Sequence, residues 1–152
     1  MNEKLNGFTI RVYGVLINEK KQTLVADEQM HGAKFTKFPG GGLKFGEGPI
    51  DCLKRECMEE MRQEIEVLEH FYTIDFFQES IFKKGKQLIS IYYLIEPKGE
   101  IQFQVTKTKF DIDFSKEEDL AFRWVKISEK LVDEMTFPVD KKVAEMLVEK
   151  FG

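Results

Sequence analysis

Alternating hydrophobic and polar residues near the start of the chain indicate a β-strand with one buried face. The alternation over residues 8–12 leads into an apolar run at 15–17, which predicts a strand that enters the core. The polar residues 18–22 predict a turn, and residues 23–26 predict the returning strand. Residues 27–39 are polar, and we expect an irregular segment there.

The middle of the chain combines one helical pattern with two strand-like segments. Residues 49–61 have the periodicity of a helix. Residues 70–78 and 87–96 are rich in β-branched and aromatic side chains, which favour strands. The intervening residues 83–86 read Lys-Lys-Gly-Lys and predict a hairpin turn between the two strands.

The last third of the chain predicts two more strands and a final helix. Apolar and polar residues alternate over 101–105, and residues 121–127 are expected to form the last strand. Residues 139–150 form an amphipathic helical pattern. Strands on both sides of a central helix, with a second helix at the end, predict one α/β/α layered domain over residues 1–152.

Composition supports a globular protein and excludes several classes. The chain has 152 residues, of which 42% are hydrophobic and 33% charged, so disorder and disulfide scaffolds are excluded. No apolar run approaches the roughly 20 residues that span a bilayer, so we expect no membrane insertion. Residues 1–5 lack the features of a signal peptide, and we expect a cytoplasmic protein.

The charge balance argues against extended nucleic-acid binding. The formal net charge is −4, and the basic clusters at 83–86 and 107–109 are short. The only two cysteines, Cys52 and Cys57, would lie about 140° apart on one helix, so they cannot pair there. We expect both to be small buried side chains.

Glycines are concentrated just before the predicted helix. Residues 40–48 contain five of the eleven glycines, which indicates unusual backbone dihedrals or a close approach to another group. No Gly-Lys-Ser/Thr follows, so the segment is not a P-loop, and it lacks the strand and spacing of a dinucleotide-binding fingerprint. At the helix start, Gly48 can serve as N-cap and Pro49 suits the first helical position.

The predicted helix has an acidic face and an apolar face. Glu56, Glu59 and Glu60 fall within about 100° of arc on a regular helix, and an apolar stripe lies on another side. These carboxylates can form a solvated surface, with Arg55 as partial compensation. Alternatively, they can bind a hard cation such as Mg²⁺, which prefers oxygen ligands and shares them with phosphates. The adjacent glycine segment favours the cation site.

The spacing of the glycine segment and the acidic helix resembles the signature of Nudix hydrolases. That signature is Gly-x5-Glu-x7-Arg-Glu-apolar-x-Glu-Glu-x-Gly-apolar, and residues 41–63 match it from Gly41 through Glu47 to Glu60. The resemblance implies a Nudix-type α/β/α sandwich with a mixed β-sheet between helices. It also implies a pyrophosphohydrolase that uses Mg²⁺ or Mn²⁺ to hydrolyse a nucleoside diphosphate linked to another moiety.

The match has three departures. Arg62 stands where the family usually has the glycine that ends the helix in a left-handed cap, and Gln63 stands where it has an apolar residue. We expect altered geometry at the helix end rather than lost activity. Lys44 stands where many relatives have a glutamate.

The resemblance also implies roles for individual residues. Glu56, Glu59 and Glu60 correspond to the metal-binding carboxylates, and Glu56 is also the expected general base. The carbonyl of Gly40 is expected to be a further metal ligand. Arg55 is expected to hold a carboxylate in place through an ion pair.

The expected partner of Arg55 in that ion pair is Glu47. Many relatives recruit one more carboxylate from a loop before the last strand. The acidic residues 117–119 occupy that region, and we expect Glu118 to join the site, with its two neighbours as alternatives. His31 and His70 are expected to be surface or packing residues.

Five aromatic residues are expected to belong mainly to the core, and one of them could stack on a nucleobase. They are Phe8, Tyr13, Phe45, Phe77 and Phe82. Residues 78–81 carry neither the proline of the family's ADP-ribose subgroup nor the tyrosine of its diadenosine-polyphosphate subgroup. The substrate is therefore expected to be a small nucleotide of open identity: a nucleotide sugar, a dinucleotide or a nucleoside triphosphate.

Three functional hypotheses remain at this point. The first is the metal-dependent hydrolase, favoured by the intact acidic set. The second is a nucleotide-binding or regulatory Nudix domain without turnover, and the third is a structural domain with a solvated acidic face. A monomer and a homodimer are both left open.

Overall fold

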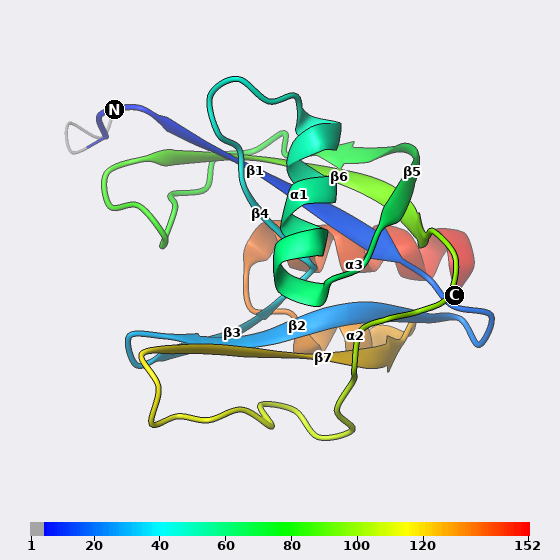
Figure 1. Cartoon of the computed structure of the whole chain (residues 1–152). Helices are drawn as coiled ribbons and strands as arrows, with labels where there is room; N and C mark the ends of the chain where they lie inside the picture. Colours follow the sequence, from blue (N-terminus) through cyan, green and yellow to red (C-terminus); the bar gives the residue numbers. More distant parts are fainter. Residues whose placement is uncertain (1–4) are drawn as a thin grey trace.

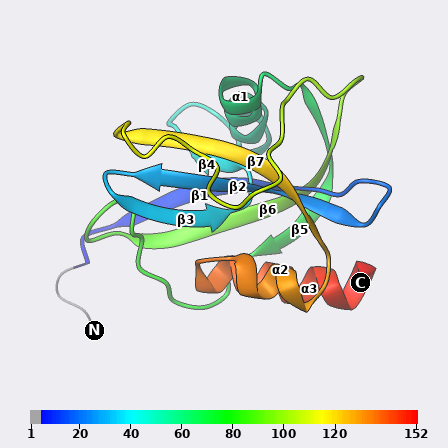
Figure 2. The same ribbon diagram turned by 90° about the horizontal axis from the view of Figure 1, so that it is seen from below.

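The computed structural model describes residues 5–152, and it has three layers (Figure 1). Seen from below, α1 (Pro49–Met61) covers one side of the strands, whereas α2 (Glu129–Glu134) and α3 (Pro138–Phe151) cover the other (Figure 2). The predicted α/β/α sandwich with a mixed sheet is therefore confirmed. Residues 1–4 lie outside the described residues. They form most of the segment 1–5, which we expect not to be a signal peptide.

The strands form two sheets in the middle layer. The first sheet has the order β4 (Gly40–Gly42), β1 (Phe8–Leu16), β6 (Gln87–Pro97) and β5 (Ile65–Thr73). In this sheet β1 and β6 are parallel, and the other pairs are antiparallel. The second sheet is antiparallel, in the order β3 (Ala33–Lys37), β2 (Gln22–Met30) and β7 (Glu118–Lys126).

Side-chain alternation along β1 divides the interior into two cores. Val12 and Leu16 pack with the apolar side of α1, whereas Tyr13 and Val15 pack with α3. Both cysteines are free and buried, as predicted. Among the described residues, no helix is long and apolar enough to cross a membrane.

The prediction of an irregular segment at residues 27–39 was wrong. Residues 22–37 form the hairpin β2–β3, in which Met30 pairs with Ala33 across a two-residue turn. His31 and Gly32 both have positive φ, +49° and +87°, as a type I′ turn requires. The buried charged residues of this segment have partners, since Lys37 pairs with Glu28 within the hairpin and Asp27 pairs with Arg123 of the neighbouring strand. Polarity alone therefore does not exclude a strand.

Several other boundaries also differ from the sequence-based predictions. β5 spans Ile65–Thr73 rather than 70–78, because only three residues separate it from the end of α1 at Met61. Residues 101–105 form no strand: Phe103 is buried against the rings of Phe122 and Trp124, but the backbone has no strand partner. The short helix α2 was not predicted, and β7 begins at Glu118, three residues before the predicted start.

One of the departures from the family pattern holds this long irregular segment in place. The side chain of Gln63 is buried, and its Oε1 accepts a hydrogen bond of 2.7 Å from the backbone N–H of Gln102. Its Nε2 donates to the carbonyl of Glu64 at 2.8 Å. An apolar residue at this position could make neither bond, so Gln63 suits this chain's own loop.

A second departure, at Arg62, places a charged residue in a left-handed backbone conformation. Arg62 caps α1 with φ +54° and ψ +36°, and its N–H donates to the carbonyl of Met58 at 3.0 Å. Arg62 thus adopts the left-handed cap that the family glycine usually forms, and the expectation of altered geometry at the helix end was wrong. A side chain with a Cβ is strained in this region, and glycine is not.

We expect Arg62→Gly to raise the free energy of unfolding by about 1 kcal/mol, because it removes this strain. Arg62→Ala is the matched control, since it removes the charge but keeps the Cβ, and it should give no such gain. Urea denaturation measures both. Activity should stay within several-fold in each variant; near-abolition in Arg62→Gly would show that Arg62 contacts substrate.

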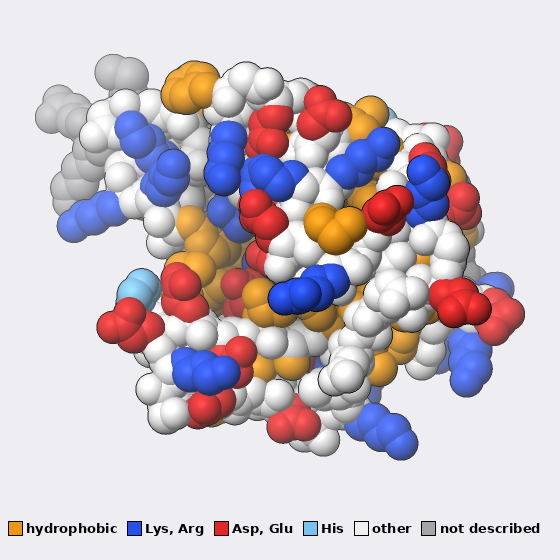
Figure 3. All heavy atoms as spheres, viewed as in Figure 1, with side chains coloured by type: hydrophobic (Ala, Val, Ile, Leu, Met, Phe, Trp, Pro, Cys, Tyr) orange, Lys and Arg blue, Asp and Glu red, His pale blue; other side chains and the backbone are white. Residues whose placement is uncertain are grey.

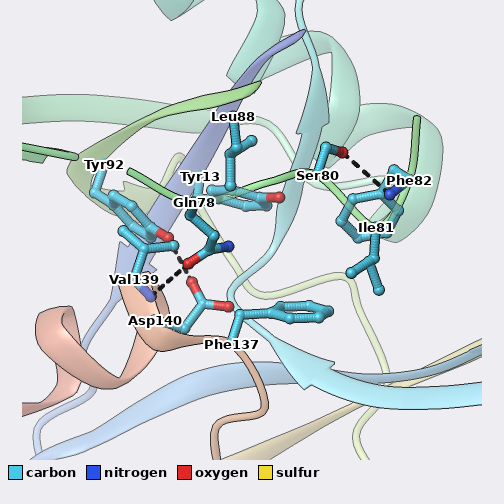
Figure 4. Close-up of a pocket in the computed structure, with 10 residues that line it drawn as sticks. All are labelled: Tyr13, Gln78, Ser80, Ile81, Phe82, Leu88, Tyr92, Phe137, Val139 and Asp140. Carbon is cyan, nitrogen blue, oxygen red and sulfur yellow. Dashed lines mark hydrogen bonds between the residues drawn. The ribbon is translucent and has the colours of Figure 1, made fainter. Parts of the chain in front are cut away.

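A small cavity beneath the first sheet contains a buried carboxyl group (Figure 4). Its volume is about 10 Å³, room for about one water molecule. Asp140, in the first turn of α3, accepts a hydrogen bond from the hydroxyl of Tyr92, and Gln78 accepts one from the N–H of Val139. Burial raises the pKa of Asp140 to about 6, although Tyr92 and nearby cations lower it.

This shift makes the stability of the fold dependent on pH. Because the folded pKa lies above the ordinary value of 3.8, Asp140 contributes its full stability below about pH 4 and loses it as the pH rises to 6. Asp140→Asn keeps an acceptor for Tyr92 and does not titrate. We expect the variant to gain up to about 3 kcal/mol relative to the parent between pH 3.5 and pH 7.

Chemical denaturation across this pH range checks the Asp140 prediction. The exposed Asp133→Asn serves as the control, since it removes a carboxylate from a surface helix, and its difference from the parent should be flat over the same range. A flat difference for Asp140→Asn as well would contradict the raised pKa.

Candidate active site

The glycine segment and α1 meet through the side chain of Arg55. Arg55 donates two hydrogen bonds to Glu47, from Nε at 2.9 Å and from Nη2 at 2.7 Å. Nη2 also donates to the carbonyl of Gly42 at 3.0 Å. Arg55 therefore ties the loop before α1 and the end of β4 to the helix. This interaction lowers the pKa of Glu47 to about 2.

Arg55 also contacts two carboxylates of the acidic face. Its Nη1 donates to Glu56 Oε1 at 2.9 Å and to Glu59 Oε2 at 3.1 Å. The guanidinium thus offsets the repulsion between neighbouring carboxylates at i and i+3 on the helix. Among the described residues, no donor contacts Oε2 of Glu56, so this oxygen is available to another group.

Glu56 lies directly against the backbone of β4. A Cβ added at Gly41 would lie 2.4 Å from the carboxyl carbon of Glu56, closer than real contacts allow. A glycine is therefore required at position 41 for the carboxylate to reach this place. Gly40 has φ +145° and pairs with Tyr13, and a Cβ there would collide with the carbonyl of Val12.

A second buried ion pair lies beside this carboxylate cluster. Lys37 Nζ is 2.9 Å from Glu28 Oε2, and both side chains are almost completely buried. The same ammonium donates to the carbonyl of Gly40 at 3.3 Å. Burial raises the pKa of Glu60 to about 7, whereas Lys37 lowers it.

The donors expected to hold a metal ion are close together but not assembled into a ready-made site. Among residues 5–152, no three His, Cys, Asp or Glu side chains are arranged to hold a metal ion. Arg55 engages Glu56 and Glu59, and Glu59 is more than half exposed. The donor set consists of carboxylate oxygens and the Gly40 carbonyl, which fits Mg²⁺ or Mn²⁺ chemically.

Glu118 lies on the same sheet face as Glu28. In the antiparallel register, Glu118 pairs with Met30 and Leu120 pairs with Glu28, so these side chains share one face. Glu118 is exposed, and its carboxylate is 3.9 Å from His31 Nε2. Its neighbour Asp119 is engaged, since it accepts a hydrogen bond from the N–H of Asp113. The structure does not bring Glu118 into contact with Glu56.

The other acidic neighbour and the histidines lie at the surface. Glu117 is exposed, and its carbonyl accepts a hydrogen bond from the N–H of His31. His70 is exposed and bonds to Thr73 at 2.8 Å. Both histidines therefore lie at the surface, as expected.

The assignment of the aromatic residues to the core was partly wrong. Phe8, Phe45 and Phe77 are exposed, because each lies at a strand end or in a loop that no second layer covers. Tyr13 is buried as expected, and Phe82 is half-buried.

Sequence reasoning missed three charged residues close to the cluster, namely Arg11, Glu28 and Lys37. Lys37 and Glu28 were not predicted to lie near the site because their segment was expected to be irregular. Arg11 is the polar partner in an alternating strand, and such a residue usually faces solvent. The signals available in the sequence were the His-Gly turn and the position of Lys37 three residues before Gly40.

Comparisons with known proteins identify the family and the fold. The family model of the NUDIX domain matches residues 7–147. No curated protein matches the sequence. The structure of MutT protein from Methanosarcina mazei Go1 is similar, with TM-score 0.67, 21% identity, and coverage of 99% of this chain and 98% of that one.

Two further solved structures share the fold. The E. coli ORF135 protein has TM-score 0.67 and 18% identity, and the alignment covers 95% of this chain and 91% of that one. A UDP-X diphosphatase has TM-score 0.61 and 15% identity, with 95% of this chain and 64% of that one covered.

We expect Glu59→Gln and Glu60→Gln to abolish high-affinity binding of Mn²⁺, because each removes a charged oxygen ligand and preserves the side-chain shape. Titration calorimetry or Mn²⁺ paramagnetic relaxation measures the affinity. Glu64→Gln, just beyond the helix, is the control for the loss of one negative charge. Unchanged affinity in both helix variants would contradict the metal assignment.

Proposed function

The chain belongs to the Nudix family and is a Nudix-type pyrophosphohydrolase, and we propose that it hydrolyses a phosphoanhydride bond in a nucleoside diphosphate linked to another moiety. We further propose that Mg²⁺ or Mn²⁺ is required. The similarity in fold to a UDP-X diphosphatase supports this substrate class.

The observation that carries the proposal is the position of Glu56. Its carboxylate rests on the backbone of Gly41, where only a glycine leaves room for it. Arg55 holds one oxygen of this carboxylate and is itself fixed by Glu47. A side chain held in this way offers its second oxygen at a defined place, which general acid–base catalysis requires.

In the proposed reaction, Glu56 accepts a proton from the attacking water. The water oxygen forms a bond to phosphorus, and the bond between this phosphorus and the bridging oxygen breaks. When bound, a divalent cation neutralises the diphosphate and lowers the pKa of the attacking water. Arg55 and Glu47 act as positioning residues, because they hold the carboxylate and the glycine segment together.

The remaining acidic residues of the proposed site act through the metal ion. Glu59 and Glu60 bind the cation together with Glu56, and the carbonyl of Gly40 is a further ligand. Glu118 lies at the exposed end of β7, on the sheet face it shares with Glu28, so it can approach substrate only from the rim of the site. We assign it a supporting role through the metal.

The second functional hypothesis is nucleotide binding without turnover. It is favoured by one observation: Arg55 bonds both Glu56 and Glu59, so the described residues contain no preassembled metal site. A panel of nucleotide sugars, dinucleotides and nucleoside triphosphates, assayed with Mg²⁺ and Mn²⁺, separates the two. Released phosphate or nucleotide supports the hydrolase, and binding without release supports the alternative.

We expect Glu56→Gln to lower kcat at least about a hundredfold with KM largely unchanged, because removing general-base help typically costs 10²–10⁴ in rate. Glu118→Gln should lower kcat less and should act partly by raising the Mg²⁺ concentration needed.

The measurement for both variants is kcat and KM at saturating Mg²⁺, on the best substrate from the panel. Glu66→Gln, on β5, serves as the control because its side chain lies outside the proposed site. If Glu118→Gln lowers kcat more than Glu56→Gln does, the base lies on β7 and the assignment of Glu56 is wrong.

A further inference from the structure

Arg11 is a partly buried cation beside the carboxylate cluster with no assigned role. It lies on β1, directly opposite Gly42 of β4 in the antiparallel register. A Cβ added at Gly42 would lie 3.8 Å from Arg11 Nη1, so the guanidinium lies over the last glycine of this strand. The carbonyl of the same glycine accepts a hydrogen bond from Arg55. Gly42 is thus flanked by two arginines with different surroundings.

The orientation of Arg11 is fixed on one side by aromatic rings. Its Nε donates a hydrogen bond to the hydroxyl of Tyr13. Its Cζ lies 3.9 Å from the centroid of the Phe82 ring, a cation–π distance. Phe82 is in turn supported by Phe35 and Phe137, with ring centroids 5.4 and 5.9 Å away. The side chain is therefore held in place without a carboxylate partner.

The two terminal nitrogens of Arg11 remain without a protein partner. Within residues 5–152, neither Nη1 nor Nη2 makes a hydrogen bond, and no carboxylate lies within 4.0 Å of the guanidinium. Arg55 and Arg123, in contrast, each bond carboxylates with several nitrogens. Neither nitrogen is among the fully buried, unpartnered polar atoms of the described residues, so both are open to solvent, and a bound anion can replace water there through charge-assisted hydrogen bonds.

Arg11 is also different from the neighbouring buried cation. Lys37 is satisfied by Glu28 and by two backbone carbonyls, so it is committed to the fold. Burial by itself lowers the pKa of Arg11, and its contact with Tyr13 raises it. The carboxylates of Glu28 and Glu56 raise it further, so both lie within electrostatic reach of Arg11 without bonding to it.

The molecule has a hollow on the face shown in Figure 3. Figure 3 shows a hollow between the region of β4 and the end of the second sheet, with hydrophobic side chains on its floor. Lys and Arg side chains lie above this hollow, and Asp and Glu side chains lie below it (Figure 3). A phosphate chain bound at the carboxylates of α1 would therefore meet cations on the β1 and β4 side.

We propose that Arg11 binds the phosphate chain of the substrate through Nη1 and Nη2, on the side of the chain opposite the carboxylates of α1. The planar guanidinium presents two parallel donors, which match the oxygens of a phosphate. Stacking on Phe82 leaves these donors free and fixes their direction. This inference rests on the proposed function, because it concerns the same substrate.

The test uses inorganic pyrophosphate, which carries the diphosphate and no base or sugar. Its binding to the full chain is measured by titration calorimetry in the presence of Mn²⁺. Arg11→Gln should weaken pyrophosphate binding at least tenfold, in line with the loss of charge-assisted hydrogen bonds. Arg11→Lys should give an intermediate loss, because a point charge remains but the paired donors do not.

Three controls separate this role from a structural one. Lys83→Gln removes an exposed cation next to Phe82 and should leave pyrophosphate affinity within twofold. Mn²⁺ affinity without pyrophosphate should be unchanged in the Arg11 variants. Phe82→Leu keeps the charge and removes the stacking surface, so it should weaken pyrophosphate binding less than Arg11→Gln does, and far-ultraviolet circular dichroism confirms folding.

The proposal is overturned if pyrophosphate affinity in folded Arg11→Gln and Arg11→Lys stays within twofold of the parent. It is also overturned if Mn²⁺ affinity falls in parallel, since Arg11 would then act on the metal site. Turnover provides a second readout: KM should rise at least tenfold in Arg11→Gln with kcat within about threefold. The two proposals can also fail separately. If Arg11→Gln weakens pyrophosphate binding tenfold but the parent protein hydrolyses no compound of the panel, the phosphate-binding role of Arg11 is supported and only the proposed hydrolase activity is refuted.

Discussion

The geometry of the site depends on the ion pair between Arg55 and Glu47. One guanidinium joins the loop before α1, the carbonyl of Gly42 and the acidic face of the helix. Without it, the carboxylate of Glu56, which lies against the backbone of Gly41, would be repelled by that of Glu59 with no cation between them. Because the pair is partly shielded from water, removing one partner would leave the other charge poorly compensated.

The second constraint is steric and comes from the glycines of β4. Gly41 leaves room for a carboxylate, and Gly42 lies beside two guanidinium groups. Charged side chains from the helix and from β1 can therefore approach the same three-residue strand from different directions. Because β4 is an edge strand without side chains, these charged groups can approach its backbone. The ion pair between Arg55 and Glu47 then fixes their positions.

The chemistry-bearing segment was the most predictable part of the molecule, because its pattern is local. The bounds of α1, its cap at Arg62 and the contact of Arg55 with Glu47 all follow from residues within about 20 positions of one another. The hairpin at residues 22–37 was not predicted, because its polar side chains are satisfied only across strands. Lys37 finds Glu28 nine residues away, and Arg123 reaches Asp27 from the far end of the chain.

This difference explains which functional residues local patterns can reveal. Glu56 belongs to a helix, and helical periodicity predicts that its side chain lies on the same face as those of Glu59 and Glu60. Arg11 belongs to a strand whose alternation places it only on one of two faces, and nothing in the adjacent sequence shows that Phe82, 71 positions later, covers that face. Its open donors become visible only when the partners of every neighbouring charge are known. Lys37 and Arg123 both bond to carboxylates of the protein, whereas the terminal nitrogens of Arg11 do not. This contrast is what indicates that Arg11 binds a ligand.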